Sequence, residues 1–132
     1  MTNLIDGVGI ASLLKEPNAA DALDAQYFAL DLESFHPRQE GEISDWIRRQ
    51  PVPVIGVGNS AIRYALPTDL QVNNRKQLDQ LIKAIEARPK ASAILVQVTR
   101  ITPELSANSA LIAESLAYST LQGGDEFQVW LA

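Results

Sequence analysis

An amphipathic helix predicted between two short apolar strands is the feature that most constrains the fold of this chain. Residues 27–32 and 52–57 are apolar runs of strand length, and the second run is apolar on both sides of the strand. Between them, residues 41–50 place three large apolar side chains on one helical stripe, Ile43, Trp46 and Ile47. A strand that is buried on both faces is typical of a covered parallel sheet. The sequence therefore predicts an α/β fold.

The middle of the chain predicts one more strand and two helices. The strand is expected at residues 69–72, and Asn73 or Asn74 then caps a helix in which Gln77 completes a capping box. The apolar stripe of that helix has the spacing i, i+3, i+4, i+7 and consists of Leu78, Leu81, Ile82 and Ile85. Residues 91–101 contain β-branched side chains that favour a strand. Their apolar spacing fits a helix better, and we interpret them as a helix.

The last thirty residues predict a long helix followed by a short one. Thr102-Pro103-Glu104 starts or redirects a helix, and Gly123-Gly124 ends it. We expect this helix to bury one face that contains large and small side chains, Leu111, Ile112, Ser115, Leu116 and Ser119. The predicted element order is α-β-α-β-β-α-α-α-α. This predicts one domain over residues 1–132, with a small, mainly parallel sheet and a helical C-terminal half.

Composition excludes several classes of function. The chain has 132 residues, a formal charge of −5, no cysteine and a single histidine, His36. Disulfides, thiolate nucleophiles and cysteine-based metal sites are therefore excluded, and we expect no metal and no cofactor. The acidic balance argues against a nucleic-acid partner. No apolar run approaches the ~20 residues that span a bilayer, and the N-terminal residues lack the basic start of a signal peptide. We expect a cytoplasmic protein without a membrane partner.

A glycine-containing turn after the second strand is the candidate ligand-binding site. Residues 56–61 match the pattern G-x-G-x-x-A, in which a dinucleotide phosphate binds at a helix N-terminus. Only five residues separate Ala61 from Pro67, so a full crossover helix does not fit there. The alternative is a tight strand exit whose glycines supply unusual backbone angles. The candidate ligand-binding residues are Gly56, Val57, Gly58 and Asn59.

Large apolar side chains near the C-terminus are the candidate interface. Phe127, Trp130 and Leu131 form one stripe, and the preceding helix contributes Tyr118. Aromatic side chains are enriched at the cores of protein interfaces. Two alternatives remain for the stripe: it packs on Ile94 and Val98 to complete the core, or it packs on a partner. Small residues on several faces of the preceding helix favour self-association.

Residues 91–131 resemble a segment of the enoyl-CoA hydratase/isomerase (crotonase) family, most closely the region ahead of the catalytic domain in longer members. The matching features are Leu95-Val96-Gln97-Val98 with Arg100, then residues 114–122, then Glu126-Phe127 with Trp130. Upstream, residues 46–57 resemble the helix and strand that enter a crotonase core. The resemblance implies a crotonase-like fold and a link to acyl-CoA thioesters.

The sequence departs from the crotonase family at both loops that form its oxyanion hole. Where the family has an alanine- and glycine-rich loop, this chain has residues 33–37, and Gly58 is followed by no glycine cluster. The resemblance therefore implies a degenerate domain without autonomous catalysis, acting in protein–protein interaction or oligomerisation. Its expected partners are a second copy of the chain or a catalytic crotonase-type subunit. The alternative is acyl-CoA binding, or enoyl-CoA hydratase/isomerase activity, at a reduced site.

Overall fold

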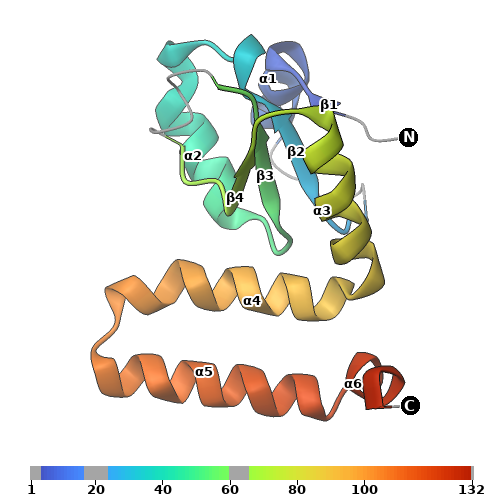
Figure 1. Cartoon of the computed structure of the whole chain (residues 1–132). Helices are drawn as coiled ribbons and strands as arrows, with labels where there is room; N and C mark the ends of the chain where they lie inside the picture. Colours follow the sequence, from blue (N-terminus) through green and yellow to red (C-terminus); the bar gives the residue numbers. More distant parts are fainter. Residues whose placement is uncertain (1–3, 17–23, 60–65, 132) are drawn as a thin grey trace.

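The computed structural model describes residues 4–16, 24–59 and 66–131, and it has an α/β architecture (Figure 1). Four parallel strands form one sheet in the order β1-β2-β3-β4. Their bounds are Leu4–Ile5, Phe28–Asp31, Val54–Val57 and Leu70–Val72. The predicted fold class, a small parallel sheet followed by a helical C-terminal half, is confirmed.

Helices cover both faces of the sheet. On one face lie α1 (Gly7–Lys15) and α2 (Glu40–Arg49), and on the other lies α3 (Arg75–Ala87). Side chains alternate along β2, so Phe28 and Leu30 join the cluster under α1 and α2 whereas Ala29 joins the cluster under α3. All four residues of β3 are buried. The two-sided apolar pattern of this strand therefore predicted its central, covered position.

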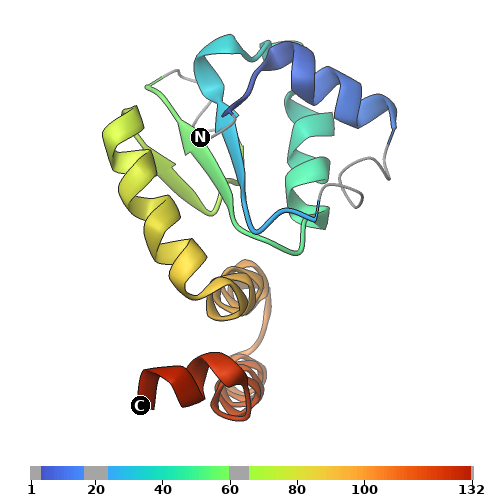
Figure 2. The same ribbon diagram turned by 90° about the vertical axis from the view of Figure 1, so that its right-hand side faces the viewer.

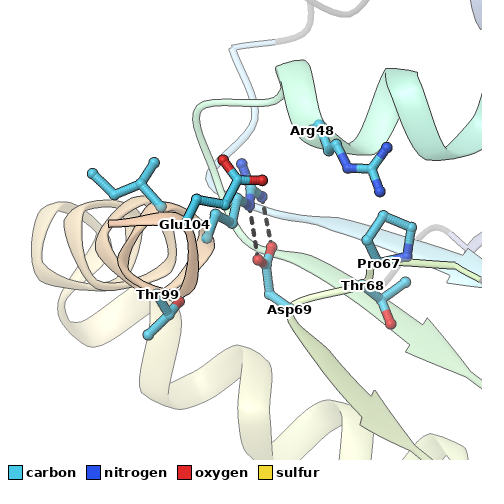
Figure 3. Close-up of a pocket in the computed structure, with 8 residues that line it drawn as sticks. Arg48, Pro67, Thr68, Asp69, Thr99 and Glu104 are labelled. Carbon is cyan, nitrogen blue, oxygen red and sulfur yellow. Dashed lines mark hydrogen bonds and ion pairs between the residues drawn. The ribbon is translucent and has the colours of Figure 1, made fainter. Parts of the chain in front are cut away.

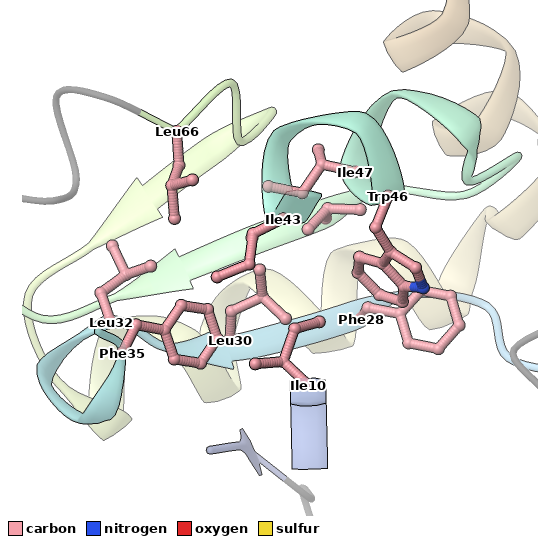
Figure 4. Close-up of a cluster of buried hydrophobic side chains, with 10 residues drawn as sticks. Ile10, Phe28, Leu30, Leu32, Phe35, Ile43, Trp46, Ile47 and Leu66 are labelled. Carbon is pink, nitrogen blue, oxygen red and sulfur yellow. The ribbon is translucent and has the colours of Figure 1, made fainter. Parts of the chain in front are cut away.

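The helical stripes predicted from the sequence form the two cores. Ile43, Trp46 and Ile47 of α2 are fully buried, and the Trp46 ring meets the Phe28 ring edge-on at a centroid distance of 5.2 Å (Figure 4). Leu78, Ile82 and Ile85 of α3 are buried against β2 and β3 on the opposite face. Burial of each large side chain contributes roughly 1.5–3 kcal/mol.

The predicted capping box of α3 is confirmed. The Asn74 side chain accepts a hydrogen bond from the Gln77 N–H at 2.9 Å, so Asn74 is the N-cap. The Gln77 side chain in turn accepts from the Asn73 N–H at 2.8 Å, one residue before the cap. The two side chains therefore satisfy backbone donors at the helix start, which explains why the helix begins there.

Two predictions of secondary structure were wrong in detail. The sequence predicted no strand before the first helix, but Leu4–Ile5 forms the edge strand β1 beside β2. A two-residue strand is too short to show a periodic pattern. Thr102–Glu104 forms only a 3₁₀ turn, and the long helix begins later, at Ala107, with Ser106 as its N-cap. The helical interpretation of residues 91–101 is confirmed by α4 (Pro89–Ile101).

The helix α4 crosses the amino edge of the sheet, and one arginine attaches it there. Arg100 forms a bidentate ion pair with Asp69, with nitrogen–oxygen distances of 2.9 and 2.6 Å (Figure 3). Its guanidinium also donates to the backbone carbonyls of Gln50 and Val52, in the segment that leads into β3. The second Asp69 oxygen accepts from the Val54 N–H at 2.8 Å. Arg100 thereby connects α4 to the starts of both β3 and β4.

The helices α5 (Ala107–Gln122) and α6 (Asp125–Leu131) lie on the side of α4 that faces away from the sheet (Figures 1 and 2). Figure 2 views α4 and α5 nearly along their axes, and it shows α5 separated from the sheet by α4. Neither α5 nor α6 contains a buried residue. Among the helices of the described residues, none is long and apolar enough to cross a membrane.

We predict that Asp69→Ala lowers the free energy of unfolding by roughly 3–5 kcal/mol, because it leaves the mostly buried Arg100 without its counter-charge. The Asp69 side chain is 4% exposed and the Arg100 side chain 17% exposed. Urea denaturation followed by circular dichroism measures the change.

The matched control is Asp45→Ala, which removes an ion pair with Arg48 whose partners are 76% and 63% exposed. Exposed pairs contribute little, so this variant is expected to unfold like the wild type. Equal losses in the two variants would contradict the role assigned to Arg100.

Candidate interaction surface

The predicted ligand-binding turn is closed by the chain itself. Gly56, Val57 and Gly58 are buried, and Gly58 has a φ of +121°, which favours glycine. A Cβ atom on Gly58 would lie 2.8 Å from the Cγ atom of Glu33. The alternative interpretation, a tight strand exit with unusual backbone angles, is therefore confirmed for Gly58. Ser60 and Ala61 of the motif lie outside the described residues.

Backbone donors at this turn are already bonded within the chain. The Gly58 N–H donates to the Val72 carbonyl at 2.9 Å, and the Asn59 N–H donates to Glu33 Oε1 at 2.9 Å. An oxyanion hole requires N–H groups that point at the ligand. These two N–H groups are unavailable to a thioester or a phosphate unless Val72 or Glu33 is displaced.

Open α/β sheets usually bind ligands at their carboxyl edge. At this edge, backbone N–H groups at the start of α1 are also bonded within the chain. The Gly7 N–H donates to Ser34 Oγ at 2.9 Å, and the Gly9 N–H donates to Asp6 Oδ1 at 2.8 Å. At the starts of both α1 and α3, backbone N–H groups thus bond to side chains of this chain: those of Gly7 and Gly9 in α1 and that of Gln77 in α3. His36 is exposed there, and its Nδ1 accepts from the Arg38 N–H at 3.2 Å. No group of three potential metal-ligating side chains occurs in the described residues.

The opposite end of the molecule exposes an unusual amount of apolar side chain. Twelve large hydrophobic residues are exposed in the described part of the chain, and ten of them lie between residues 95 and 131. Those in α5 and α6 are each about 60% exposed or more: Leu111, Ile112, Leu116, Tyr118, Val129, Trp130 and Leu131. Contiguous apolar patches of this kind mark interaction sites.

The face of α5 that the sequence predicted to be buried points away from the rest of the molecule. We call it the outer stripe and define it by Leu111, Ile112, Ser115, Leu116 and Ser119, all of which are exposed. The partly covered side of α5 carries small residues instead, Ala110, Ala113 and Ala117, together with Leu121. Because α5 packs alongside α4, this side is the one turned to α4. Alanines permit close helix approach, so the large residues remain outside.

Three of the four predicted interface residues, Tyr118, Phe127 and Trp130, line one apolar groove of about 320 Å³ between α4, α5 and α6. We call it the terminal groove, and its other lining residues are Arg88, Ala91, Leu121, Gln122 and Glu126. The Phe127 and Trp130 rings stack at a centroid distance of 5.8 Å. Trp130 and Leu131 are 62% and 59% exposed. Trp130 and Leu131 therefore do not complete the core, whereas Phe127 is partly buried.

Two acidic residues, Glu126 and Asp125, hold α6 against the start of α4, a contact that the sequence did not predict. Glu126 accepts hydrogen bonds from the N–H groups of Lys90 and Ala91 at 2.7 and 2.9 Å, so it caps the N-terminus of α4. The residue at the N-cap of α4 is Arg88, whose side chain cannot accept. This missing acceptor at the N-cap was the only indication in the sequence that the N–H groups of α4 need an acceptor from a distant part of the chain.

An ion pair between Lys90 and Asp125 reinforces this contact, with a nitrogen–oxygen distance of 2.8 Å. The hydrogen bond and the charge of Lys90 hold the pKa of the Asp125 carboxyl below its ordinary value of 3.8. The same hydrogen bond and the charge of Asp125 raise the pKa of Lys90 above 10.5. Both side chains are exposed, so the pair positions α6 without burying charge.

A polar cleft of about 560 Å³ lies between the amino edge of the sheet and the end of α4 (Figure 3). Arg48, Thr68, Thr99 and Glu104 line it together with the Arg100–Asp69 pair. The pair is already saturated by its partners in the chain. This ion pair therefore belongs to the contact between α4 and the sheet.

Comparison of the chain with protein-family models, with curated proteins and with solved structures finds no match.

We predict opposite outcomes for the two tryptophans. Trp46→Ala is expected to lower the free energy of unfolding by about 3–5 kcal/mol, because Trp46 is fully buried. Trp130→Ala is expected to lower it by about 1 kcal/mol or less, because the ring is largely exposed. Urea denaturation at low micromolar concentration measures both changes. A loss of several kcal/mol in Trp130→Ala would place this ring in the core.

We also predict that the Asp125 carboxyl titrates below pH 3.8 in the folded chain and returns toward that value in Lys90→Gln. A depressed carboxyl pKa stabilises α6 above pH 3.8, and this contribution is lost as the pH falls through the folded pKa. The raised Lys90 pKa stabilises α6 below pH 10.5, and this contribution is lost as the pH rises through the folded pKa.

Carboxyl ¹³C shifts measured by NMR against pH test this prediction. Lys83→Gln, which removes an exposed lysine of α3, is the control and is expected to leave the Asp125 titration unchanged. An unchanged Asp125 titration in Lys90→Gln would contradict the assignment.

Proposed function

We propose that this chain is a non-catalytic, auxiliary crotonase-like domain that acts through protein–protein interaction in association with acyl-CoA metabolism. Its partner is a second copy of the chain or a catalytic crotonase-type subunit. The observation that carries the proposal is the concentration of exposed large apolar side chains between residues 95 and 131. Isolated exposed hydrophobic residues are ordinary, but nine within three adjacent helices and a tenth, Leu105, in the turn between two of them favour a cover.

The division of the molecule into two ends supports an interaction function. The sheet with α1, α2 and α3 buries most of its large apolar side chains in two clusters. In contrast, α5 buries none and carries a single carboxylate, Glu114, which is exposed. A helix without buried residues gains little from its own chain, so it is positioned to pack against another molecule.

The closed turn at residues 56–59 supports the absence of autonomous catalysis. The crotonase resemblance implies that a thioester oxyanion would need donors at this turn, and the Gly58 and Asn59 N–H groups donate to Val72 and Glu33 instead. Because these backbone donors are occupied, the turn favours an interaction domain over the alternative, in which a reduced acyl-CoA site is retained.

We predict that isothermal titration of the chain with saturated and enoyl-CoA esters detects no micromolar binding, because the backbone donors of the turn are occupied. Hydration of crotonyl-CoA is expected to proceed at the rate of buffer alone. A micromolar dissociation constant, or hydration above buffer, would reject the proposed function in favour of the alternative.

If acyl-CoA binding is detected, two variants locate the binding site. Gly58→Ala forces a side chain onto a backbone with a φ of +121° and into contact with Glu33, so it disturbs a site at the turn. Trp130→Ala opens the terminal groove and leaves the turn unchanged. Loss of binding in only one variant identifies the site.

A further inference from the structure

We propose that the terminal groove is a binding site for a small aromatic carboxylate, which stacks its ring on the exposed aromatic side chains and places its carboxylate on Arg88. This inference goes beyond the proposed function, which concerns a protein partner and requires no small-molecule ligand.

The terminal groove has the size and the walls of a small-molecule site. Its volume of about 320 Å³ lies at the low end of the ~300–1,000 Å³ that ligand pockets occupy. The walls come from three helices: Ala91 of α4, Tyr118 and Leu121 of α5, and Phe127 and Trp130 of α6. Ligand pockets combine mostly apolar walls with a few polar groups that fix the orientation of the ligand. A molecule of one or two rings therefore matches this space.

The aromatic side chains of the groove favour a flat ring as the apolar part of the ligand. The Phe127 and Trp130 rings stack with an interplanar angle of 27°. Trp130 is 62% exposed and Tyr118 is 64% exposed, so both present ring surface to a ligand. A further ring that packs on them gains stacked or edge-to-face contacts in addition to the burial of apolar surface. An aliphatic ligand of the same size gains only the burial.

Arg88 is the charged residue of the groove whose side chain remains unpaired among the described residues. Glu126, the other charged residue of the lining, accepts hydrogen bonds from the Lys90 and Ala91 N–H groups at 2.7 and 2.9 Å. The positive end of the α4 dipole lies at these N–H groups and offsets the charge of the carboxylate. The neighbouring Asp125 carboxylate pairs with Lys90. The charge left for a ligand is therefore the guanidinium of Arg88.

A carboxylate is the ligand group that fits this guanidinium. The planar fork of donors matches the two oxygens of a carboxylate, so two parallel hydrogen bonds form. The backbone of Arg88 is fixed between α3 and α4, because its N–H donates to the Ile85 carbonyl at 3.1 Å and its carbonyl accepts from the Ser92 N–H at 3.0 Å. A side chain on an ordered backbone loses less freedom when it binds a ligand. A doubly charged phosphate would find only this one cation, with the Glu126 carboxylate nearby.

The two tryptophans of the chain provide the readout, since each indole N–H gives one signal in a ¹H–¹⁵N correlation spectrum. Titration with indole-3-acetate is expected to shift the Trp130 signal, with a dissociation constant of about 1 mM or tighter for a ligand of this size. The Trp46 signal is the internal control and is expected to stay in place, because Trp46 is fully buried outside the groove. A Trp130 signal that does not move at roughly ten times this concentration overturns the inference.

Two ligands of similar shape test the charge. Indole-3-acetamide is neutral and tryptamine is a cation, and both keep the indole ring. The acetamide is expected to bind about tenfold more weakly than indole-3-acetate, because a hydrogen bond to a charged group is lost, and tryptamine is expected to bind more weakly still. Equal affinities for the three ligands, or tightest binding of tryptamine, overturn the assignment to a carboxylate.

Arg88→Gln tests the contact with the carboxylate. It is expected to lower the affinity for indole-3-acetate about tenfold and to leave the affinity for indole-3-acetamide nearly unchanged, since only the charged ligand uses the guanidinium. Arg38→Gln, which removes an exposed arginine outside the groove, is the matched control and is expected to change neither affinity. If Arg88→Gln retains the preference for the carboxylate, Arg88 is not its partner and the inference fails.

A second pair of variants tests the contact with the ring. Trp130→Ala is expected to weaken the binding of indole-3-acetate, followed by the backbone N–H signal of Ala91 in the groove. The control is Val129→Ala, which truncates a residue of α6 that is 76% exposed and does not line the groove. Circular dichroism confirms that each variant remains folded. Equal affinities in the two variants overturn the inference. The proposed function fails separately, by micromolar binding or hydration of acyl-CoA.

Discussion

The ion pair between Arg100 and Asp69 is the interaction on which the arrangement of this molecule depends. It joins α4 to the start of β4, and the same guanidinium bonds two carbonyls in the segment before β3. Four hydrogen bonds from one side chain satisfy a guanidinium that is mostly buried, as burial of a charge requires. Because α5 and α6 contact the chain mainly through α4, Arg100 helps to place the helical half relative to the sheet, together with the buried Val96 and with Gln97, which donates to the Pro51 carbonyl at 2.9 Å.

The two edges of the sheet differ in which groups are satisfied within the chain. At the carboxyl edge, side chains such as Glu33, Ser34 and Asp6 accept hydrogen bonds from backbone donors that a ligand would otherwise use. At the amino edge, α4 covers the sheet, and beyond it α5 and α6 present apolar side chains to solvent. Backbone donors at the carboxyl edge are thus bonded within the chain, whereas the large apolar side chains of α5 and α6 are exposed. The exposed apolar surface supports the proposed interaction function.

The helix α5 illustrates how a correct pattern leads to a wrong assignment of burial. Its amphipathic stripe is real, and Leu111, Ile112 and Leu116 do share one face. Periodicity identifies a face but not what the face contacts. The alanine side packs within the chain because small residues let two helices approach closely. The large residues Leu111, Ile112 and Leu116 are left exposed on the other side of the helix, so the burial that the sequence predicted for this face was wrong.

The sequence alone determined the α/β class, the burial of β3 on both faces and the capping box of α3, because each depends on local spacing or local backbone conformation. It left the glycine turn at Gly58 open between a ligand site and a tight strand exit. Only the tertiary structure decided the pairing of β1, the closure of the glycine turn by Glu33, the attachment of α4 by Arg100 and the capping of α4 by Glu126. These contacts join residues that lie 25 or more positions apart. No local pattern encodes such pairs, because their partners are brought together only when the helices and strands pack.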